Sequence, residues 1–151
     1  MKKILYRTTI SAILISIVLI ALSSCNAIYP KLPVKTENGI QFITDSLNFS
    51  IAKSKTENRP LFVMVHANYC SVCRKMLKDV FPEKEVGDFY NTKFVNLILD
   101  IDAGSTDKFN NDYQIQGTPT FLFFAPDGHL IKKTSGYMSK QTLIEFAQNL
   151  N

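Results

Sequence analysis

Two cysteines three positions apart are the residues of this chain best suited to chemistry. They stand in the segment Cys70-Ser71-Val72-Cys73, directly after a short apolar run and at the start of a predicted helix. Two intervening residues in the first turn of a helix bring the two thiols within disulfide distance. The free N–H groups and the dipole at a helix N-terminus favour a thiolate, the form that attacks a disulfide. The pair therefore predicts thiol–disulfide exchange, with Cys70 as the exposed nucleophile and Cys73 as the more buried resolving thiol.

The elements that must position the pair alternate between helix and strand from about residue 39. Continuous apolar runs predict buried strands, and a turn predicts one further strand after them; the strands are Leu61–Val65, Phe94–Leu99, Thr120–Ala125 and Leu130–Thr134. Helical patterns cover Asp45–Glu57, Ser71–Val80, Asp107–Tyr113 and a closing segment with Leu143, Ala147 and Leu150 on one face. This order predicts an α/β fold with a central mixed β-sheet flanked by helices.

The residues around the pair resemble the thioredoxin superfamily. The resemblance rests on the apolar run before the pair, on residues 67–73, and on Gly117-Thr118-Pro119-Thr120 further along the chain. Residues 80–100 are most similar to bacterial domains related to the C-terminal domain of the transmembrane disulfide reductase. The resemblance implies a thioredoxin-like fold in which Pro119 is cis and faces the pair.

The same resemblance assigns substrate contacts. It implies that Thr118, next to Pro119, offers backbone groups to an extended substrate. It also implies that Tyr69 covers the substrate site, because relatives usually carry Trp just before the first cysteine and this chain has Tyr there.

The sequence departs from the family in its proton relay. Many thioredoxins bury an Asp six residues before the first cysteine and pair it with a Lys, whereas these positions are Met64 and Ile98 here. Because both are apolar, no charge is stranded in the interior. We expect resolution of mixed disulfides to be slower without being abolished. Proton transfer would need water, a backbone group or His66, four residues before Cys70.

Other roles for the pair stay open on the sequence alone. A structural disulfide would close a very short loop and therefore restrict the unfolded chain little. A metal site could combine His66, Cys70 and Cys73 with a distant His129, although structural zinc sites generally use four ligands. These possibilities amount to a non-enzymatic thioredoxin-like module for binding or metal handling. We expect the enzyme, with no metal and no cofactor other than the redox-active disulfide.

The N-terminal residues predict export. Lys2, Lys3 and Arg7 precede a mostly apolar run over Ile10–Leu22. This arrangement is typical of a secretory signal peptide, because the run is shorter than the roughly 20 residues that span a bilayer. An uncleaved single-span anchor is the alternative, and both interpretations put the domain outside the cytoplasm.

The apolar run ends in Leu22-Ser23-Ser24-Cys25, which resembles the bacterial lipobox. The resemblance implies a signal peptide over 1–24, lipidation at Cys25, a tether over 25–38 and a thioredoxin-like domain over 39–151. Residue 26 is Asn and not Asp, which in the proteobacterial sorting rule favours the outer membrane. The expected location is the bacterial cell envelope, with the lipid-anchored domain facing the periplasm.

Charge narrows the choice of partners. The chain has 17 Lys and Arg against 13 Asp and Glu, and the loss of the three basic residues of the signal leaves it nearly neutral. A nucleic-acid binder would need a basic surface, so that class is excluded. We expect a monomeric thiol–disulfide oxidoreductase that acts on protein or peptide disulfides. The resemblance favours the reductase direction and a membrane disulfide reductase as electron donor.

Overall fold

The structure is a computed structural model that describes residues 37–44 and 46–150. The predicted signal peptide and the lipidation site Cys25 lie outside the described residues, as does most of the predicted tether. Within the described part of the chain, no helix is long and apolar enough to cross a membrane.

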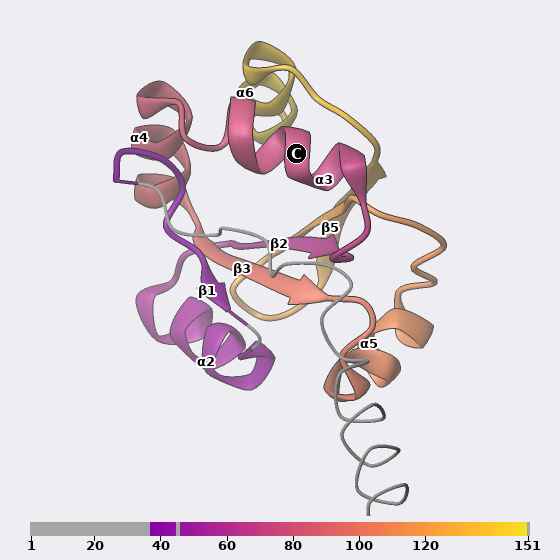
Figure 1. Cartoon of the computed structure of the whole chain (residues 1–151). Helices are drawn as coiled ribbons and strands as arrows, with labels where there is room; N and C mark the ends of the chain where they lie inside the picture. Colours follow the sequence, from indigo (N-terminus) through magenta and orange to yellow (C-terminus); the bar gives the residue numbers. More distant parts are fainter. Residues whose placement is uncertain (1–36, 45, 151) are drawn as a thin grey trace, which may run out of the picture. The chain divides into compact units, whose positions relative to one another are not determined.

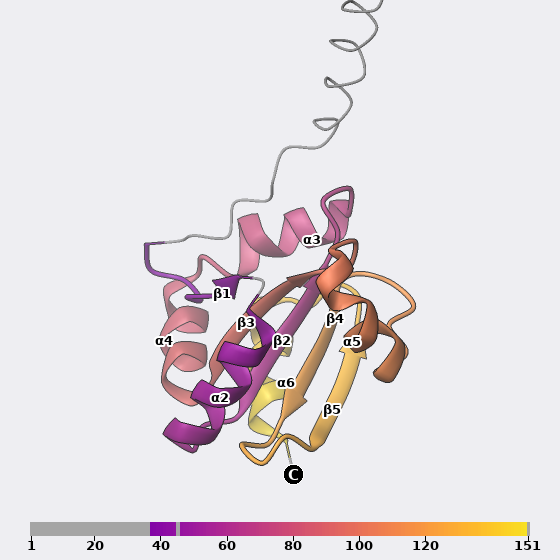
Figure 2. The ribbon, with the colours of Figure 1, turned by 90° about the horizontal axis from the view of Figure 1, so that it is seen from below.

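Five strands form one mixed sheet in the order β1-β3-β2-β4-β5 (Figures 1 and 2). The central strand β2 pairs in parallel with β3 on one side and antiparallel with β4 on the other. All residues of β2 and β4 are buried, as expected for strands covered on both faces. The predicted mixed sheet is therefore confirmed. The strands are β1 (Ile43–Thr44), β2 (Leu61–His66), β3 (Val95–Asp100), β4 (Thr120–Phe124) and β5 (Leu130–Ser135).

Helices cover both faces of this sheet (Figure 1). One face carries α3 (Ser71–Lys75), which continues into a π-helical segment, η2 (Met76–Val80), together with α4 (Lys84–Lys93) and α6 (Lys140–Gln148). The other face carries α2 (Leu47–Glu57), the 3-10 turn η3 (Gly104–Thr106) and α5 (Asp107–Asp112). Because side chains alternate along a strand, β2 contributes to two separate cores, one on each face.

Two elements differ from the sequence expectation. The patterns predict no helix between the second and third predicted helices, yet α4 is there, with only Val86, Gly87 and Tyr90 buried. The patterns also predict no strand before Leu61, yet Ile43 belongs to β1 and pairs with Leu97 of β3. The first helix begins at Leu47, two residues later than predicted.

The segment that leads into β1 is fixed against α4. Ile40 is fully buried, and its N–H donates to the carbonyl oxygen of Phe81 at 2.9 Å. The Asn91 side chain donates to the carbonyl oxygen of Gly39 at 3.0 Å. Gly87 permits this approach, because a Cβ atom there would lie only 2.7 and 2.8 Å from the C and Cα atoms of Gly39. The start of the domain is thus part of its core.

Candidate active site

The cysteine pair lies at the N-terminus of α3, just beyond the end of β2. A disulfide joins Cys70 and Cys73, whose Cα atoms are 5.3 Å apart. Cys70 is the N-cap residue of α3, and its Sγ accepts a hydrogen bond from the N–H of Cys73 at 3.0 Å. A hydrogen bond donated to the ionised form of a group lowers its pKa. The same amide would therefore stabilise a thiolate on Cys70 once the disulfide is reduced.

The two cysteines differ in accessibility. Cys73 is fully buried, and Cys70 retains 8% of its surface. Cys70 is much less exposed than the sequence pattern suggests. Cys70 is still the more accessible residue of the pair.

Arg74 holds the loop that precedes Cys70. Its guanidinium donates to the carbonyl oxygen of Asn68, and to that of Tyr69 at 3.3 Å. The Asn68 side chain in turn donates to Oδ2 of Asp100 at 2.8 Å. Asp100 is the last residue of β3, so the loop is tied to both α3 and the sheet.

The Thr118–Pro119 peptide bond is cis, as the family resemblance implies. Pro119 directly precedes β4, and the first residue of β4, Thr120, pairs with Val65 near the end of β2. The cis-proline loop and the cysteine pair therefore lie at the same end of the sheet. The structure thus places Thr118, Pro119 and Cys70, which are distant in the sequence, at the same end of the sheet.

Exposed apolar side chains border the pair. Tyr69, just before the first cysteine, is 55% exposed, and Val72, between the two cysteines, is 37% exposed. Tyr137 is 47% exposed, and Nζ of Lys75 in α3 lies 4.7 Å from its ring centroid. Sequence reasoning missed Tyr137. The available signal was an aromatic residue next to a glycine, Gly136, just after the last predicted strand. In the structure Gly136 has a φ of +94° and directly follows β5.

The interior beneath the pair carries no charge at the positions of the usual relay. Met64 and Ile98 are buried and are direct partners across β2 and β3. His66, the last residue of β2, is 6% exposed. By strand alternation its side chain shares the face of β2 that Met64 and the cysteine pair occupy. His66 is thus on the correct face for a part in proton transfer, and that part remains a prediction.

The four residues proposed for a metal site do not come together. His129 lies in the turn between β4 and β5, at the end of β4 remote from Pro119, and its Nδ1 is 2.7 Å from Oδ1 of Asp127. Nowhere in the described ranges do three or more His, Cys, Asp or Glu side chains form a group that could hold a metal ion.

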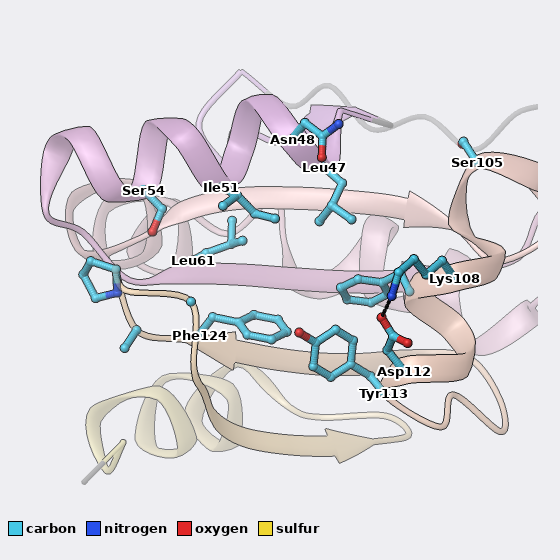
Figure 3. Close-up of a pocket in the computed structure, with 14 residues that line it drawn as sticks. Leu47, Asn48, Ile51, Ser54, Leu61, Ser105, Lys108, Asp112, Tyr113 and Phe124 are labelled. Carbon is cyan, nitrogen blue, oxygen red and sulfur yellow. Dashed lines mark hydrogen bonds and ion pairs between the residues drawn. The ribbon is translucent and has the colours of Figure 1, made fainter.

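A cavity on the opposite face of the sheet does not belong to this site. It has a volume of about 350 Å³ and lies between α2 and α5 on the face opposite α3 (Figure 3). Leu61 and Phe124 form part of its lining, and Lys108 and Asp112 form an ion pair at one end. The sheet separates it from the cysteines.

Comparison with known proteins decides the family. The model of the thioredoxin-like domain family matches residues 47–151. The chain belongs to the thioredoxin-like family. Among solved structures, a protein of Bacteroides thetaiotaomicron assigned as a disulfide isomerase has a TM-score of 0.68 and 26% identity, over 77% of this chain and 96% of that one. The oxidised C-terminal domain of DsbD from Neisseria meningitidis has a TM-score of 0.64 at 16% identity, over 74% and 100% of the two chains, and shows the shared fold.

Curated relatives of this thioredoxin-like chain are longer proteins. The thiol:disulfide interchange protein DsbD of Pseudoalteromonas atlantica is 26% identical over 109 residues, 70% of this chain. A chloroplast thioredoxin-like protein of Arabidopsis thaliana, HCF164, is 22% identical over 69% of this chain. The chain spans 18% and 43% of the lengths of these two relatives. The predicted fold and the predicted relation to DsbD are confirmed.

Proposed function

We propose that this chain is a thiol–disulfide oxidoreductase that reduces protein disulfides outside the cytoplasm. The observation that carries the proposal is the Cys70–Cys73 disulfide at the N-terminus of α3, in which Sγ of Cys70 accepts a hydrogen bond from the N–H of the buried Cys73. That arrangement supports a reactive thiolate on Cys70, the more accessible of the two cysteines. The family relation to DsbD supports the same activity.

The reaction proceeds by two exchanges at sulfur. The Cys70 thiolate attacks one sulfur of a substrate disulfide, forming a Cys70–substrate disulfide and releasing the other substrate sulfur as a thiolate, which takes up a proton. The Cys73 thiolate then attacks the Cys70 sulfur, closes the Cys70–Cys73 disulfide and releases the second substrate thiol. Two electrons pass to the substrate, and the pair carries them itself.

The second exchange requires Cys73 to lose its proton in a buried site. Burial disfavours the charged thiolate, and the apolar Met64 and Ile98 supply no base. The proton must leave through water, a backbone group or His66. A His66→Gln variant tests the last route: its resolution step should lose the pH dependence near neutrality that an imidazole provides. An unchanged pH profile of resolution would remove His66 from the mechanism.

Continued turnover needs an external dithiol. We propose that another protein at the membrane, a disulfide reductase of the DsbD kind, reduces the Cys70–Cys73 disulfide after each cycle. Lipidation of Cys25 would hold the domain at the membrane, with residues 25–38 as tether and the domain, over 39–151, facing the periplasm as a monomer. Outer-membrane sorting follows from Asn26 in this proposal. Radiolabelled palmitate incorporated into the wild type and not into Cys25→Ser would support the anchor, and equal labelling would contradict it.

The activity is tested by insulin reduction with dithiothreitol. Wild-type protein should accelerate precipitation of the insulin B chain, and Cys70→Ser should abolish the acceleration. A silent wild type, or a Cys70→Ser variant as active as the wild type, would refute the enzyme. Stoichiometric metal in the reduced protein would instead support a metal-handling module. A reduction potential near −270 mV would fit a reductant and one near −120 mV an oxidant.

A further inference from the structure

The segment after β5 joins the two halves of the site. The N–H of Gly136 donates to the carbonyl oxygen of the cis Pro119 at 3.0 Å. Two residues later, the N–H of Met138 donates to Sδ of Met76 in η2 at 3.5 Å. Tyr137 lies between these two contacts. Its backbone is therefore fixed beside both the cis-proline loop and the helix that carries the cysteines.

The Tyr137 ring lies on the surface, although the backbone N–H groups of both neighbouring residues are hydrogen-bonded within the domain. It is 47% exposed, whereas Met138 is 6% exposed. Nζ of Lys75 lies over the ring at 4.7 Å, a cation–π distance that holds the ring against α3. Val72 is three residues before Lys75 on the helix and so occupies the same side of α3. Lys75 thus holds the ring on the side of α3 where Val72 is exposed.

Half of the large exposed hydrophobic side chains in the described residues lie at this end of the molecule. Of the six large hydrophobic side chains that are exposed in the described part of the chain, three border the cysteine pair: Tyr69, Val72 and Tyr137. The other three, Phe49, Ile51 and Leu130, lie on α2 and at the start of β5. We define Tyr69, Val72 and Tyr137 as the apolar rim.

The chemistry of exchange determines what covers this rim. A substrate sulfur must come within covalent distance of the Cys70 sulfur, about 2 Å. The residues next to that substrate cysteine must then lie over the neighbouring surface. An extended segment that follows the cis-proline loop reaches Tyr137, because Gly136 is hydrogen-bonded to Pro119. The occupant of the rim is the segment that flanks the substrate's cysteine.

We propose that Tyr137 is a specificity-determining residue that receives an aromatic or large aliphatic side chain close to the reacting cysteine of the substrate. The inference rests on the proposed oxidoreductase function and names its substrate class: disulfides flanked by apolar residues in an extended segment. Burial of two apolar groups against each other supplies the preference. Lys75 is a positioning residue that keeps the ring in place.

Two disulfide-linked peptides that differ only in the residue after the cysteine, Phe in one and Ser in the other, test the proposal. The full chain is reduced, freed of reductant and mixed with each peptide in single turnover, and the rate is measured against peptide concentration. The Phe peptide should reach half-maximal rate at about fivefold lower concentration, with the same maximal rate. Tyr137→Ser should remove this preference, so that the two peptides reach half-maximal rate at the same concentration. Phe49→Ser, which removes an exposed aromatic ring from α2, should retain the preference.

Three outcomes would overturn the inference: no preference in the wild type, an equal loss for both peptides in Tyr137→Ser, or the same loss in Phe49→Ser. Bis(2-hydroxyethyl) disulfide, which has no side chain for the rim, reports the exchange chemistry separately. If the reduced chain fails to react with this compound and with both peptides, the proposed function itself fails. If it reacts with all three without preference, only the role of Tyr137 is refuted. Circular dichroism of each variant confirms that it is folded.

Discussion

Replacement of Gly87 by Ala should detach the start of the domain from α4. In an exposed helix this change stabilises by about 1 kcal/mol, because Ala has the higher helix propensity. Here the added Cβ would lie 2.7 and 2.8 Å from backbone atoms of Gly39, which cannot swing aside as a side chain would. The segment that contains Gly39 and Ile40 must therefore move away from the helix.

The cost of that movement follows from the contacts it breaks. The bonds from the Ile40 N–H to Phe81 and from Asn91 to the Gly39 carbonyl contribute about 1 kcal/mol each. The Ile40 side chain is fully buried, which is worth about 1.5–3 kcal/mol. After subtraction of the gain in helix propensity, Gly87→Ala should destabilise the protein by about 2.5–4 kcal/mol.

Urea denaturation followed by circular dichroism measures this loss. The midpoint should fall while the m-value stays close to that of the wild type. Gly104→Ala is the matched control, because a Cβ at Gly104 meets nothing within 4 Å, and its stability should change by less than about 1 kcal/mol. If Gly87→Ala were as stable as the wild type, the close approach of the segment with Gly39 and Ile40 to α4 would be refuted.

Three further changes probe other contacts. Burial raises the pKa of the Tyr90 hydroxyl, so above pH 10 the unfolded chain loses a proton that the folded chain keeps, and stability should fall as pH rises. Tyr90→Phe should lower the free energy of unfolding by about 1 kcal/mol at neutral pH, because it loses the hydrogen bond to a carbonyl oxygen of α6. The variant should also lose less stability than the wild type as pH rises above 10, measured by urea denaturation. An equal loss in the two proteins would contradict this. Arg59→Met removes donors to carbonyl oxygens at the C-terminal end of α4 and should lower the free energy of unfolding in urea by about 2 kcal/mol. Lys84→Met breaks only an exposed ion pair and should lower it by less than about 0.5 kcal/mol. Equal losses in the two variants would refute this distinction. Cys73→Ser should accumulate a mixed disulfide between Cys70 and substrate, visible by mass spectrometry of the intact protein, and adducts on another residue would contradict the assigned order of attack.

The sequence predicts those parts of the fold whose patterns are continuous and local. The buried runs that become β2, β3 and β4 have no polar interruption long enough to suggest another structure, and the cysteine pair falls at a strand–helix junction. The cis bond at Pro119 depends on contacts with distant segments. Only the family resemblance made it predictable.

The parts that escaped prediction depend on long-range contacts. Helix α4 is largely polar and has Gly87 near its middle, so neither periodicity nor propensity indicates a helix. Two of its buried residues make long-range contacts: Gly87 lies against the segment that leads into β1, and Tyr90 bonds to α6. Strand β1 has two residues and is defined by its pairing with β3. Tyr137 joins the site through Gly136 and Lys75, which lie far apart in the sequence.

The apolar rim has a spectroscopic consequence, because the chain contains no Trp. Its intrinsic fluorescence comes from tyrosine alone, and two of those tyrosines, Tyr69 and Tyr137, border the redox pair. Tyr137→Trp would introduce a single indole next to the disulfide, with no other indole emission to subtract. Its emission wavelength would respond to a substrate covering the ring, and its intensity to oxidation of the neighbouring thiols. Docking and electron transfer could then be timed separately in one stopped-flow trace.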